Sequence, residues 1–241
     1  MNKIAVFYLI GQIGNNWKEI YNHQINLLEK CGLYNNIEFI DVYVVGKEQL
    51  PSVRDKFNNV TYLGYLEEEI PSNKKLYRAD KTIFKNIWSF SKLYQDYKIL
   101  FYHALGVSSP KNSWRTYLEN INLGYWKECV ELLNHYDCVG TEYVPLASYK
   151  NHTIEFPAPH YQGGFWWANA SYIQRLDPFY FHAPVEIQHF LGELWIGTGS
   201  PKAYSFYNTG LEKNLSLIEI KYPFSDILLN ARNHLKQLTP P

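Results

Sequence analysis

The chain has 241 residues, and its 23 lysine and arginine residues balance its 23 aspartate and glutamate residues. This length suits one large domain or two small ones, and no internal repeat or low-complexity tract divides it. The charge balance provides no overall positive field, which excludes a nonspecific partner of nucleic acid or anionic lipid. The three cysteines, Cys31, Cys129 and Cys138, have no paired metal-binding spacing, and we expect buried free thiols.

The N-terminal segments alternate between strand and helix. Lys3 to Ile10 is a continuous apolar run, which predicts a strand covered on both faces. The run is too short for a membrane span and lacks a basic leader and a small-residue cleavage site, so we expect a cytoplasmic protein without a transmembrane segment. A helix is predicted from Trp17 to Cys31 and a strand from Ile37 to Val45. This order predicts parallel pairing through a crossover helix.

The following segments continue the alternation. We predict a short strand at Val60 to Leu66, a helix from Arg78 to Tyr94 and a buried strand from Lys98 to Tyr102. The last strand ends abruptly at His103. Ligands bind at the carboxyl ends of strands in open parallel sheets, so His103 lies where chemistry is expected.

The second half of the chain is less regular. A long helix is predicted from Ser113 to His135, with a helix-weakening Gly124 inside it, and a strand from Cys138 to Val144. Shorter or later elements are predicted at Thr153 to Phe156, Ala170 to Leu176, Ser216 to Ile220 and Ile227 to Leu238. The whole pattern predicts an α/β fold with a mixed, mostly parallel, Rossmann-like sheet flanked by helices.

Two adjacent glycines, Gly163 and Gly164, precede three aromatic residues, Phe165, Trp166 and Trp167. One interpretation is a strand that enters the core, with the glycines forming a bulge. The other is a sugar-binding wall, in which the glycines let the backbone approach a ligand and one ring turns outward. Three rings in a row cannot all face one side of a strand. We therefore favour the sugar-binding interpretation, with polar groups supplied by His160, Gln162 and Asn169.

Glu193 lies between Gly192 and the apolar residues Leu194 and Trp195. A carboxylate in apolar surroundings either finds a partner or has its pKa raised, which makes Glu193 a candidate base, nucleophile or charge stabiliser. The alternative is a residue that caps a backbone amide. His103 is a candidate for binding a divalent metal or a diphosphate, although a solitary histidine is more often structural. No dinucleotide-binding glycine pattern follows the first strand, which counts against a dehydrogenase.

Several motifs in chain order carry a resemblance to a known family. They are Ile4-Ala5-Val6-Phe7-Tyr8, Tyr102-His103-Ala104-Leu105-Gly106, Trp114-Arg115, Gly163-Gly164-Phe165-Trp166-Trp167-Ala168 and Glu193-Leu194-Trp195-Ile196-Gly197. From about residue 3 to residue 199, the chain resembles GT-A-fold glycosyltransferases of bacterial polysaccharide clusters and large DNA viruses. We expect one domain over residues 1–241, with a nucleotide-binding half (1–110), an acceptor and catalytic half (111–199) and a C-terminal extension (200–241) that the resemblance does not cover.

The activity implied by this resemblance is transfer of a sugar from a nucleotide-sugar donor to an acceptor hydroxyl in polysaccharide or glycan synthesis. A UDP-sugar is the expected donor, and a glycan or lipid-linked molecule the expected acceptor, which permits peripheral association with a membrane. The family commonly has an Asp-x-Asp or His-Thr-Lys-Gly-like sequence after the inner strand, but this chain has no aspartate there and has Leu105 in place of lysine. A Mn²⁺ or Mg²⁺ ion at His103 is therefore an open expectation, with Arg115 or Lys111 as alternative sources of positive charge for the leaving diphosphate.

The resemblance also assigns residues to roles. Glu193 is the expected catalytic residue, as a base in an inverting enzyme or as a nucleophile or stabiliser in a retaining one. The residues expected to bind the nucleotide and diphosphate are Phe7, Tyr8, Gly11, His103, Gly106 and Arg115. Those expected to contact the donor sugar and acceptor are His160, Gly163, Gly164, Phe165, Trp166, Trp167 and Trp195. The alternatives are a noncatalytic carbohydrate-binding module and an inactive scaffold with the same fold.

Overall fold

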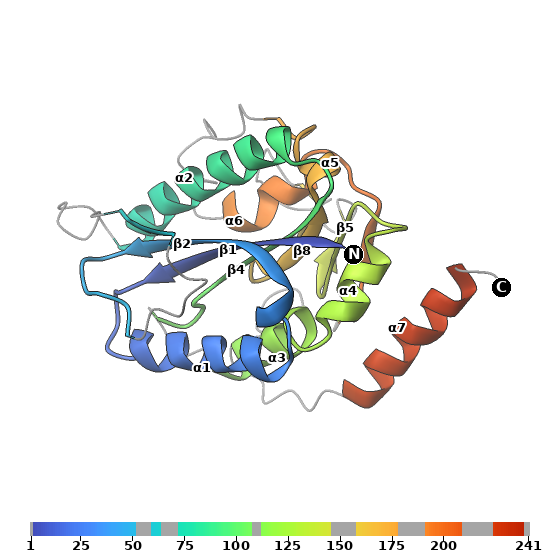
Figure 1. The fold of residues 1–241 in the computed structure, drawn as a ribbon, viewed down its shortest axis with the longest axis horizontal. Helices are drawn as coiled ribbons and strands as arrows, with labels where there is room; N and C mark the ends of the chain where they lie inside the picture. Colours follow the sequence, from blue (N-terminus) through green and yellow to red (C-terminus); the bar gives the residue numbers. More distant parts are fainter. Residues whose placement is uncertain are drawn as a thin grey trace, which may run out of the picture.

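A computed structural model describes residues 2–51, 59–63, 72–107, 112–145, 158–177, 191–208 and 224–238. In this part of the chain, helices cover both faces of a central sheet (Figure 1). The helices are α1 (Trp17–Lys30), α2 (Ser72–Leu93), α3 (Asn112–Asn122), α4 (Trp126–Leu132), α5 (Ala170–Ile173), α6 (Leu191–Leu194) and α7 (Phe224–Leu238), with 3-10 turns η1 (Tyr34–Asn36) and η6 (Trp195–Gly197). One face packs against α1, α3 and α4, and the other packs against α2, α5 and α6.

The central sheet of the described residues has the strand order β3-β2-β1-β4-β8-β5-β9. Its strands are β1 (Lys3–Gly11), β2 (Ile37–Val45), β3 (Val60–Tyr62), β4 (Tyr97–His103), β5 (Cys138–Gly140), β8 (Trp166–Asn169) and β9 (Ala203–Ser205). β8 is antiparallel to both of its neighbours, and the other pairs are parallel. A separate antiparallel pair joins β6 (Tyr143–Val144) to β7 (His160–Tyr161). The predicted mixed, mostly parallel α/β fold is therefore confirmed.

Two predicted elements are interrupted. The long helix expected from Ser113 to His135 is two helices, α3 and α4, because the chain turns at Gly124, where a Cβ would lie 2.3 Å from the carbonyl oxygen of Asn120. The strand expected from Cys138 to Val144 is divided into β5 and β6 at Glu142, whose φ of 58° lies in the left-handed region. The segments predicted at Thr153 to Phe156 and at Ser216 to Ile220 lie outside the described residues.

The alternating side chains of β1 contribute to two cores. Tyr8 faces the α1 side, where its ring stacks on that of Tyr102 with centroids 4.3 Å apart. Phe7 faces the α2 side, where its ring packs on Phe39 and Phe90 at 5.7 and 5.5 Å. Both residues are buried in the interior of the sheet. The expectation that Phe7 and Tyr8 contact a base or ribose is therefore wrong, because their rings form the two cores on either side of β1.

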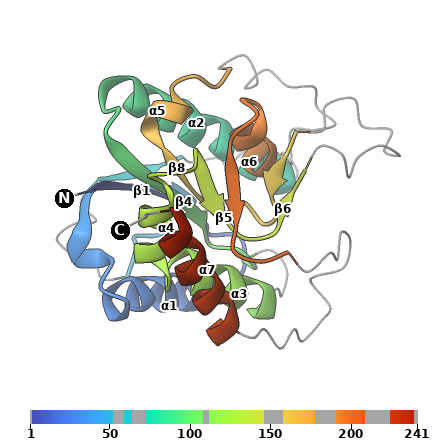
Figure 2. The same cartoon turned by 90° about the vertical axis from the view of Figure 1, so that its right-hand side faces the viewer.

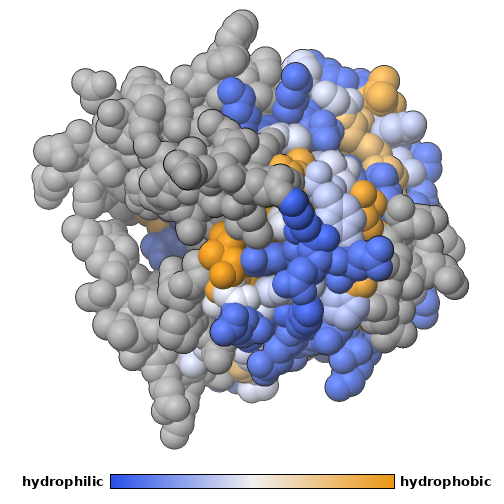
Figure 3. Space-filling model, turned by 90° about the vertical axis from the view of Figure 1, so that its left-hand side faces the viewer, coloured by the Kyte–Doolittle hydropathy of each residue, from blue (hydrophilic) through white to orange (hydrophobic). Residues whose placement is uncertain are grey.

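The order of strands reverses between β1 and β4, which lie side by side in parallel with Leu9 opposite His103. The carboxyl ends of β1, β4 and β5 and the amino end of the antiparallel β8 share one edge of the sheet. Figure 3 views the side of the molecule toward which β1 and β2 point, where hydrophilic and hydrophobic residues are both exposed. Open α/β sheets bind ligands at such a reversal, so this edge is the first place to look for a functional site.

The C-terminal helix α7 packs against α4 (Figure 2). Its buried residues Ile227, Ala231 and Leu235 face the core, and His234 Nε2 lies 2.6 Å from the hydroxyl of Tyr136. The helix predicted at Ile227 to Leu238 therefore packs its apolar face against the rest of the domain. Within the described ranges, no helix combines the length and apolarity that crossing a bilayer requires.

Candidate active site

His103 ends β4 at the reversal of the sheet. Its Nε2 lies 2.8 Å from the carbonyl oxygen of Gly163, and because a carbonyl only accepts, Nε2 carries the proton of this hydrogen bond. The imidazole ring also lies 5.3 Å from the ring of Phe165, measured between centroids. The histidine that closes the inner strand is thus held directly against the glycine turn that leads into β8.

Glu193 approaches the same glycine from α6. Its Oε1 accepts a hydrogen bond from the amide of Gly163 at 3.1 Å, and its Oε2 lies 3.7 Å from Nε2 of His160. The side chain of Glu193 is 32% exposed, so the carboxylate is oriented by the protein and still accessible from outside. The structure therefore brings together four of the predicted site residues, namely His103, His160, Gly163 and Glu193.

The turn at Gly163 and Gly164 requires glycine. Both residues have positive φ, 83° and 68°, a region that costs other residues roughly 1–2 kcal/mol each. A Cβ at Gly163 would lie 2.5 Å from Cδ1 of Leu118 and 3.0 Å from Nε1 of Trp114, both on α3. This close approach to α3 is what places the amide and the carbonyl of Gly163 between Glu193 and His103.

The aromatic residues after the glycines are core residues. The side chains of Phe165, Trp166, Trp167 and Trp195 are all fully buried. Trp166 packs on Phe101 on the α2 side, while Trp167 on the other side donates from Nε1 to the carbonyl of Asn122 at 2.8 Å. The expected outward-facing ring is therefore wrong, and the alternative interpretation of a strand entering the core describes β8.

Two of the polar residues expected beside these rings, His160 and Asn169, lie at different ends of the sheet. His160 is buried on β7, and its Nδ1 donates to the carbonyl oxygen of Ala158 at 3.1 Å. Burial lowers the pKa of His160, so the neutral ring faces Glu193 near neutral pH. Asn169 lies at the opposite end of β8 from the glycines, where its amide donates to the carbonyls of Leu133 and Tyr136. Asn169 therefore belongs to the far edge of the sheet.

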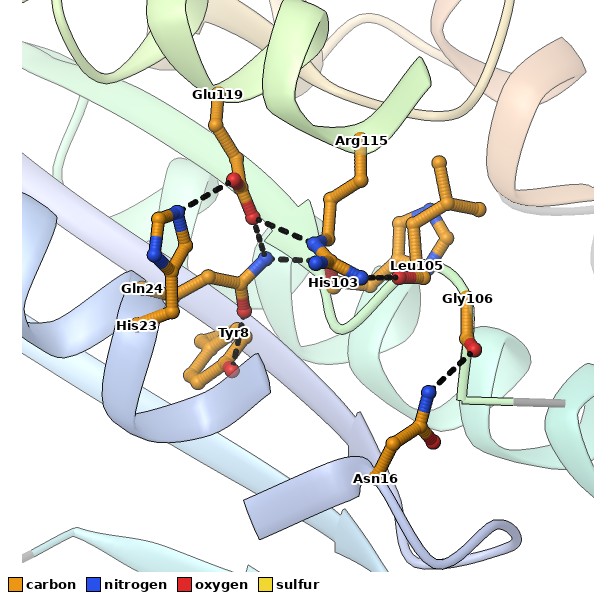
Figure 4. A network of polar contacts seen from close by, with 9 residues as sticks. All are labelled: Tyr8, Asn16, His23, Gln24, His103, Leu105, Gly106, Arg115 and Glu119. Carbon is orange, nitrogen blue, oxygen red and sulfur yellow. Dashed lines mark hydrogen bonds and ion pairs between the residues drawn. The ribbon is translucent and has the colours of Figure 1, made fainter. Parts of the chain in front are cut away.

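A buried polar network holds the loop that follows β4 (Figure 4). Nε2 of Gln24, on α1, donates to the carbonyl of His103 at 3.2 Å and to Oε1 of Glu119 at 2.8 Å. The other end of the Gln24 amide accepts from the hydroxyl of Tyr8 at 2.5 Å. His23 Nε2 lies 3.1 Å from Oε2 of Glu119, and this contact raises the pKa of His23. Through Gln24, the network holds the backbone of His103 from the α1 side of the sheet.

Arg115 and Gly106 belong to this support. Arg115 is buried on α3, donates from Nη1 to the carbonyl of Leu105 at 3.2 Å and lies 3.4 Å from Glu119. Gly106 has a φ of 95°, and its carbonyl accepts from the side-chain amide of Asn16 at 3.2 Å. The guanidinium of Arg115 therefore bonds the backbone of the loop after β4 and the carboxylate of Glu119. It was expected to contact a diphosphate.

The turn after β1 lies beside the same loop. Gly11 is buried at the end of β1 and pairs with Val45, and a Cβ on Gly14 would lie only 2.0 Å from the carbonyl oxygen of Val107. The turn after β1 therefore lies next to the loop after His103. Both segments could contribute to one site at this edge of the sheet. The predicted candidate Lys111 lies outside the described residues.

Sequence reasoning missed two acids near this edge. Asp80 lies on α2, three, four and seven residues before the buried side chains of Ile83, Phe84 and Ile87. This spacing places the half-buried carboxyl group of Asp80 on the apolar face of the helix. Burial and the negative charge of Glu193 raise the pKa of Asp80 from 3.8 to about 8. The interruption of an apolar helix face by one acid was a signal that could have identified Asp80.

Glu142 is the second missed acid. It follows β5, is buried, has a positive φ and accepts a hydrogen bond from the hydroxyl of Tyr117 at 3.0 Å. Its backbone carbonyl accepts from the amide of Gln162, directly before the glycine turn. No sequence pattern distinguishes Glu142 from an ordinary strand residue, because its position depends on the break between β5 and β6.

The described residues do not assemble a metal-binding set. Among them, no three histidine, cysteine, aspartate or glutamate side chains are grouped so that they could hold an ion together. His103 offers one imidazole, and its Nε2 proton is already directed at Gly163. We therefore assign no step of a reaction to a metal.

No protein-family model matches the chain, and no curated protein is detectably similar to it. The functional interpretation consequently depends on the fold and on the geometry of the edge that contains His103, Gly163 and Glu193.

Proposed function

We propose that the protein is a glycosyltransferase with a GT-A-like fold, which moves a sugar from a nucleotide-sugar donor to an acceptor hydroxyl. The observation that carries this proposal is the convergence of His103, Gly163 and Glu193 where the strand order reverses. Open α/β sheets bind ligands at this position, and an oriented, partly exposed carboxylate there suits proton transfer. The resemblance of the sequence motifs supports the same activity.

Glu193 is the proposed base. In an inverting reaction, its carboxylate takes the proton of the acceptor hydroxyl while the hydroxyl oxygen bonds to the anomeric carbon of the donor sugar. The bond from that carbon to the diphosphate oxygen breaks, and the electron pair leaves with the nucleoside diphosphate. The amide of Gly163 holds one oxygen of Glu193, and the neutral His160 lies beside the other. These two contacts orient the carboxylate of Glu193.

Charge accumulates on the departing diphosphate and must be stabilised by fixed donors or cations. We propose that the backbone and imidazole of the His103 loop face this group, because the network around Gln24 and Arg115 holds the loop rigidly. A divalent ion and a UDP-sugar donor stay predictions from the family resemblance.

The alternative of a noncatalytic carbohydrate-binding module depended on an exposed aromatic wall. The rings of Phe165, Trp166, Trp167 and Trp195 are buried, so no ring of this group is available for stacking on a sugar. Their burial removes the sugar contacts expected of these rings in both proposals, but the enzyme proposal retains the oriented carboxylate of Glu193 beside Gly163.

A donor panel tests the proposal. We would incubate the full chain with UDP-, GDP-, CMP- and TDP-sugars, each with Mn²⁺, with Mg²⁺ and with EDTA, and measure binding by calorimetry and release of the nucleotide product. We expect binding and slow hydrolysis of at least one donor. Absence of both across the panel would contradict a glycosyltransferase, and equal results with EDTA would contradict metal dependence.

The variant Glu193→Gln tests the catalytic role. We expect turnover to fall by roughly 10²–10⁴-fold, the usual contribution of a general base, while donor affinity changes little. Glu131→Gln is a matched control because Glu131 is an exposed acid on α4. Turnover that survives in Glu193→Gln and equals that of the control would remove Glu193 from the mechanism.

A further inference from the structure

The glycine turn lies opposite a short segment that joins β5 to β6. The pairing of β5 with β8 ends at Gly140 and Trp166, and the pairing of β6 with β7 begins at Tyr143 and Tyr161. Between these pairings, residues 162–165 lie opposite only two residues of the other segment. The glycine turn is therefore a bulge, and its shape depends on how these two residues hold it.

Glu142, the second of these two residues, has an uncommon backbone conformation. Its φ of 58° lies in the left-handed region, where the Cβ is crowded and glycine is usual. In this conformation its amide donates to the carbonyl of Tyr207 at 2.8 Å, and its carbonyl accepts from the amide of Gln162 at 3.1 Å. The backbone of Glu142 therefore holds the residue directly before Gly163. Strain of this kind is concentrated at functional sites, where the surrounding structure maintains it.

The side chain of Glu142 holds the other side of the turn. Its Oε1 accepts a hydrogen bond from the hydroxyl of Tyr117 at 3.0 Å, and the residue is only 3% exposed, so it is too deep to touch a substrate. The ring of Tyr117 stacks on that of Trp114 with centroids 5.4 Å apart. Nε1 of Trp114 in turn lies 3.0 Å from the place that a Cβ on Gly163 would occupy. The carboxylate of Glu142 therefore fixes the two α3 rings against which Gly163 packs.

We propose that Glu142 is a positioning residue that acts through Gly163: it fixes the turn whose amide orients Glu193. This inference rests on the proposed function, because it concerns the placement of the proposed base. Glycine would adopt the left-handed conformation with less strain, so the bond to Tyr117 explains why an acid occupies this position. A base must be held within about 0.5 Å of its productive geometry. A loosened turn should therefore slow the chemical step more than it weakens donor binding.

Three variants separate the backbone of Glu142 from its side chain. Glu142→Gly keeps the left-handed conformation accessible and removes the carboxylate. With the donor found in the panel, we expect kcat to fall roughly 10²-fold, the effect of misplacing a group by about 1 Å, while the KM for the donor stays within about twofold. Tyr117→Phe removes the donating hydroxyl and should also lower kcat and spare KM. Glu142→Gln should stay within about threefold of the wild-type kcat, because its amide oxygen accepts the same bond.

Two control variants make matched changes elsewhere. Ser200→Gly relieves the other non-glycine residue with positive φ among those that the structure describes, at an exposed position with a φ of 50°. Tyr136→Phe removes a tyrosine hydroxyl that contacts His234 on α7. Both controls should keep the wild-type kcat per folded molecule. A kcat of Glu142→Gly equal to that of Ser200→Gly, or a kcat of Glu142→Gln as low as that of Glu142→Gly, would overturn the proposal. If Glu142→Gly does not fold, the comparison of Tyr117→Phe with Tyr136→Phe decides in the same way.

A measurement without substrate separates this inference from the proposed function. The amide nitrogen of Gly163 lies 3.1 Å from Oε1 of Glu193. In crystal structures of the unliganded wild type, Glu142→Gly and Tyr117→Phe, we expect this distance to be longer in both variants by roughly 0.5 Å or more, beyond the tolerance of a catalytic arrangement. Equal distances in all three would overturn the inference, whatever the activity. If no donor is turned over, the proposed function fails, and the distance still decides whether Glu142 sets the turn.

Discussion

The two sides of the candidate site are built by different means. On the β1 and β4 side, side chains such as Gln24 and Arg115 hold the backbone of the His103 loop through buried hydrogen bonds. On the β5 and β8 side, the Gly163 turn is held by steric fit against α3 and by buried rings. The difference teaches that one side depends on polar partners and the other on shape, so each should fail under a different kind of substitution.

The largest expected effect is on the side held by shape. Trp167→Ala should lower the free energy of unfolding by about 3–5 kcal/mol, because it removes a fully buried ring and its bond to Asn122. Denaturant unfolding measures this loss. The control is Leu229→Ala, which changes a side chain that is 56% exposed and should shift stability by about 0.5 kcal/mol or less. If Trp167→Ala were as stable as the control, the ring would not be a core residue, and a ligand-binding role would again have to be considered.

A smaller effect is expected on the side held by polar partners. Gln24→Leu keeps the volume but leaves Tyr8, Glu119 and the carbonyl of His103 without this amide, at a cost of roughly 1–3 kcal/mol. Asn36→Ala is the control, because the Asn36 amide bonds one carbonyl and is exposed. Equal stabilities of the two variants would show that the network does not support the loop.

The smallest effect concerns the pH dependence of that network. The bond to Glu119 raises the pKa of His23, so the folded state holds this proton above the ordinary value of 6.5. The stabilisation is complete below pH 6.5 and is lost as the pH rises through the folded pKa. The His23 side chain is 51% exposed, so solvent screening limits the effect to about 1 kcal/mol or less. His23→Gln should remove this dependence in unfolding curves taken between pH 5 and 9, and a slope equal to wild type would contradict it.

The sequence predicts the first half of the sheet well. β1, β2 and β4 are long apolar runs, and the helices between them have regular spacing, so local pattern and tertiary environment agree. His103 could be placed at a functional edge because the rule for parallel sheets needs only the end of a strand. Its contact with Gly163 joins residues 60 positions apart, and no local pattern contains that information.

The second half is harder to predict because its elements are short. β5 has three residues and β8 has four, and β8 inserts antiparallel between strands that precede it in the chain. Both faces of β8 are covered by helices, so side chains that alternate between the faces are buried on either one. The rule that neighbouring residues face opposite sides therefore could not show that Trp166 and Trp167 both lie in the core. Glu142 and Asp80 gain their importance from neighbours that only the fold supplies.

Gly163 gives this protein a built-in spectroscopic reporter. Its amide donates a hydrogen bond to Glu193, and its carbonyl accepts one from His103. One residue is therefore bonded to side chains from both sides of the candidate site. The chemical shift and the exchange rate of a single glycine amide should therefore respond to anything that occupies or protonates the Glu193 carboxylate. A ligand screen can follow that resonance with no label on the ligand and before any reaction has been identified.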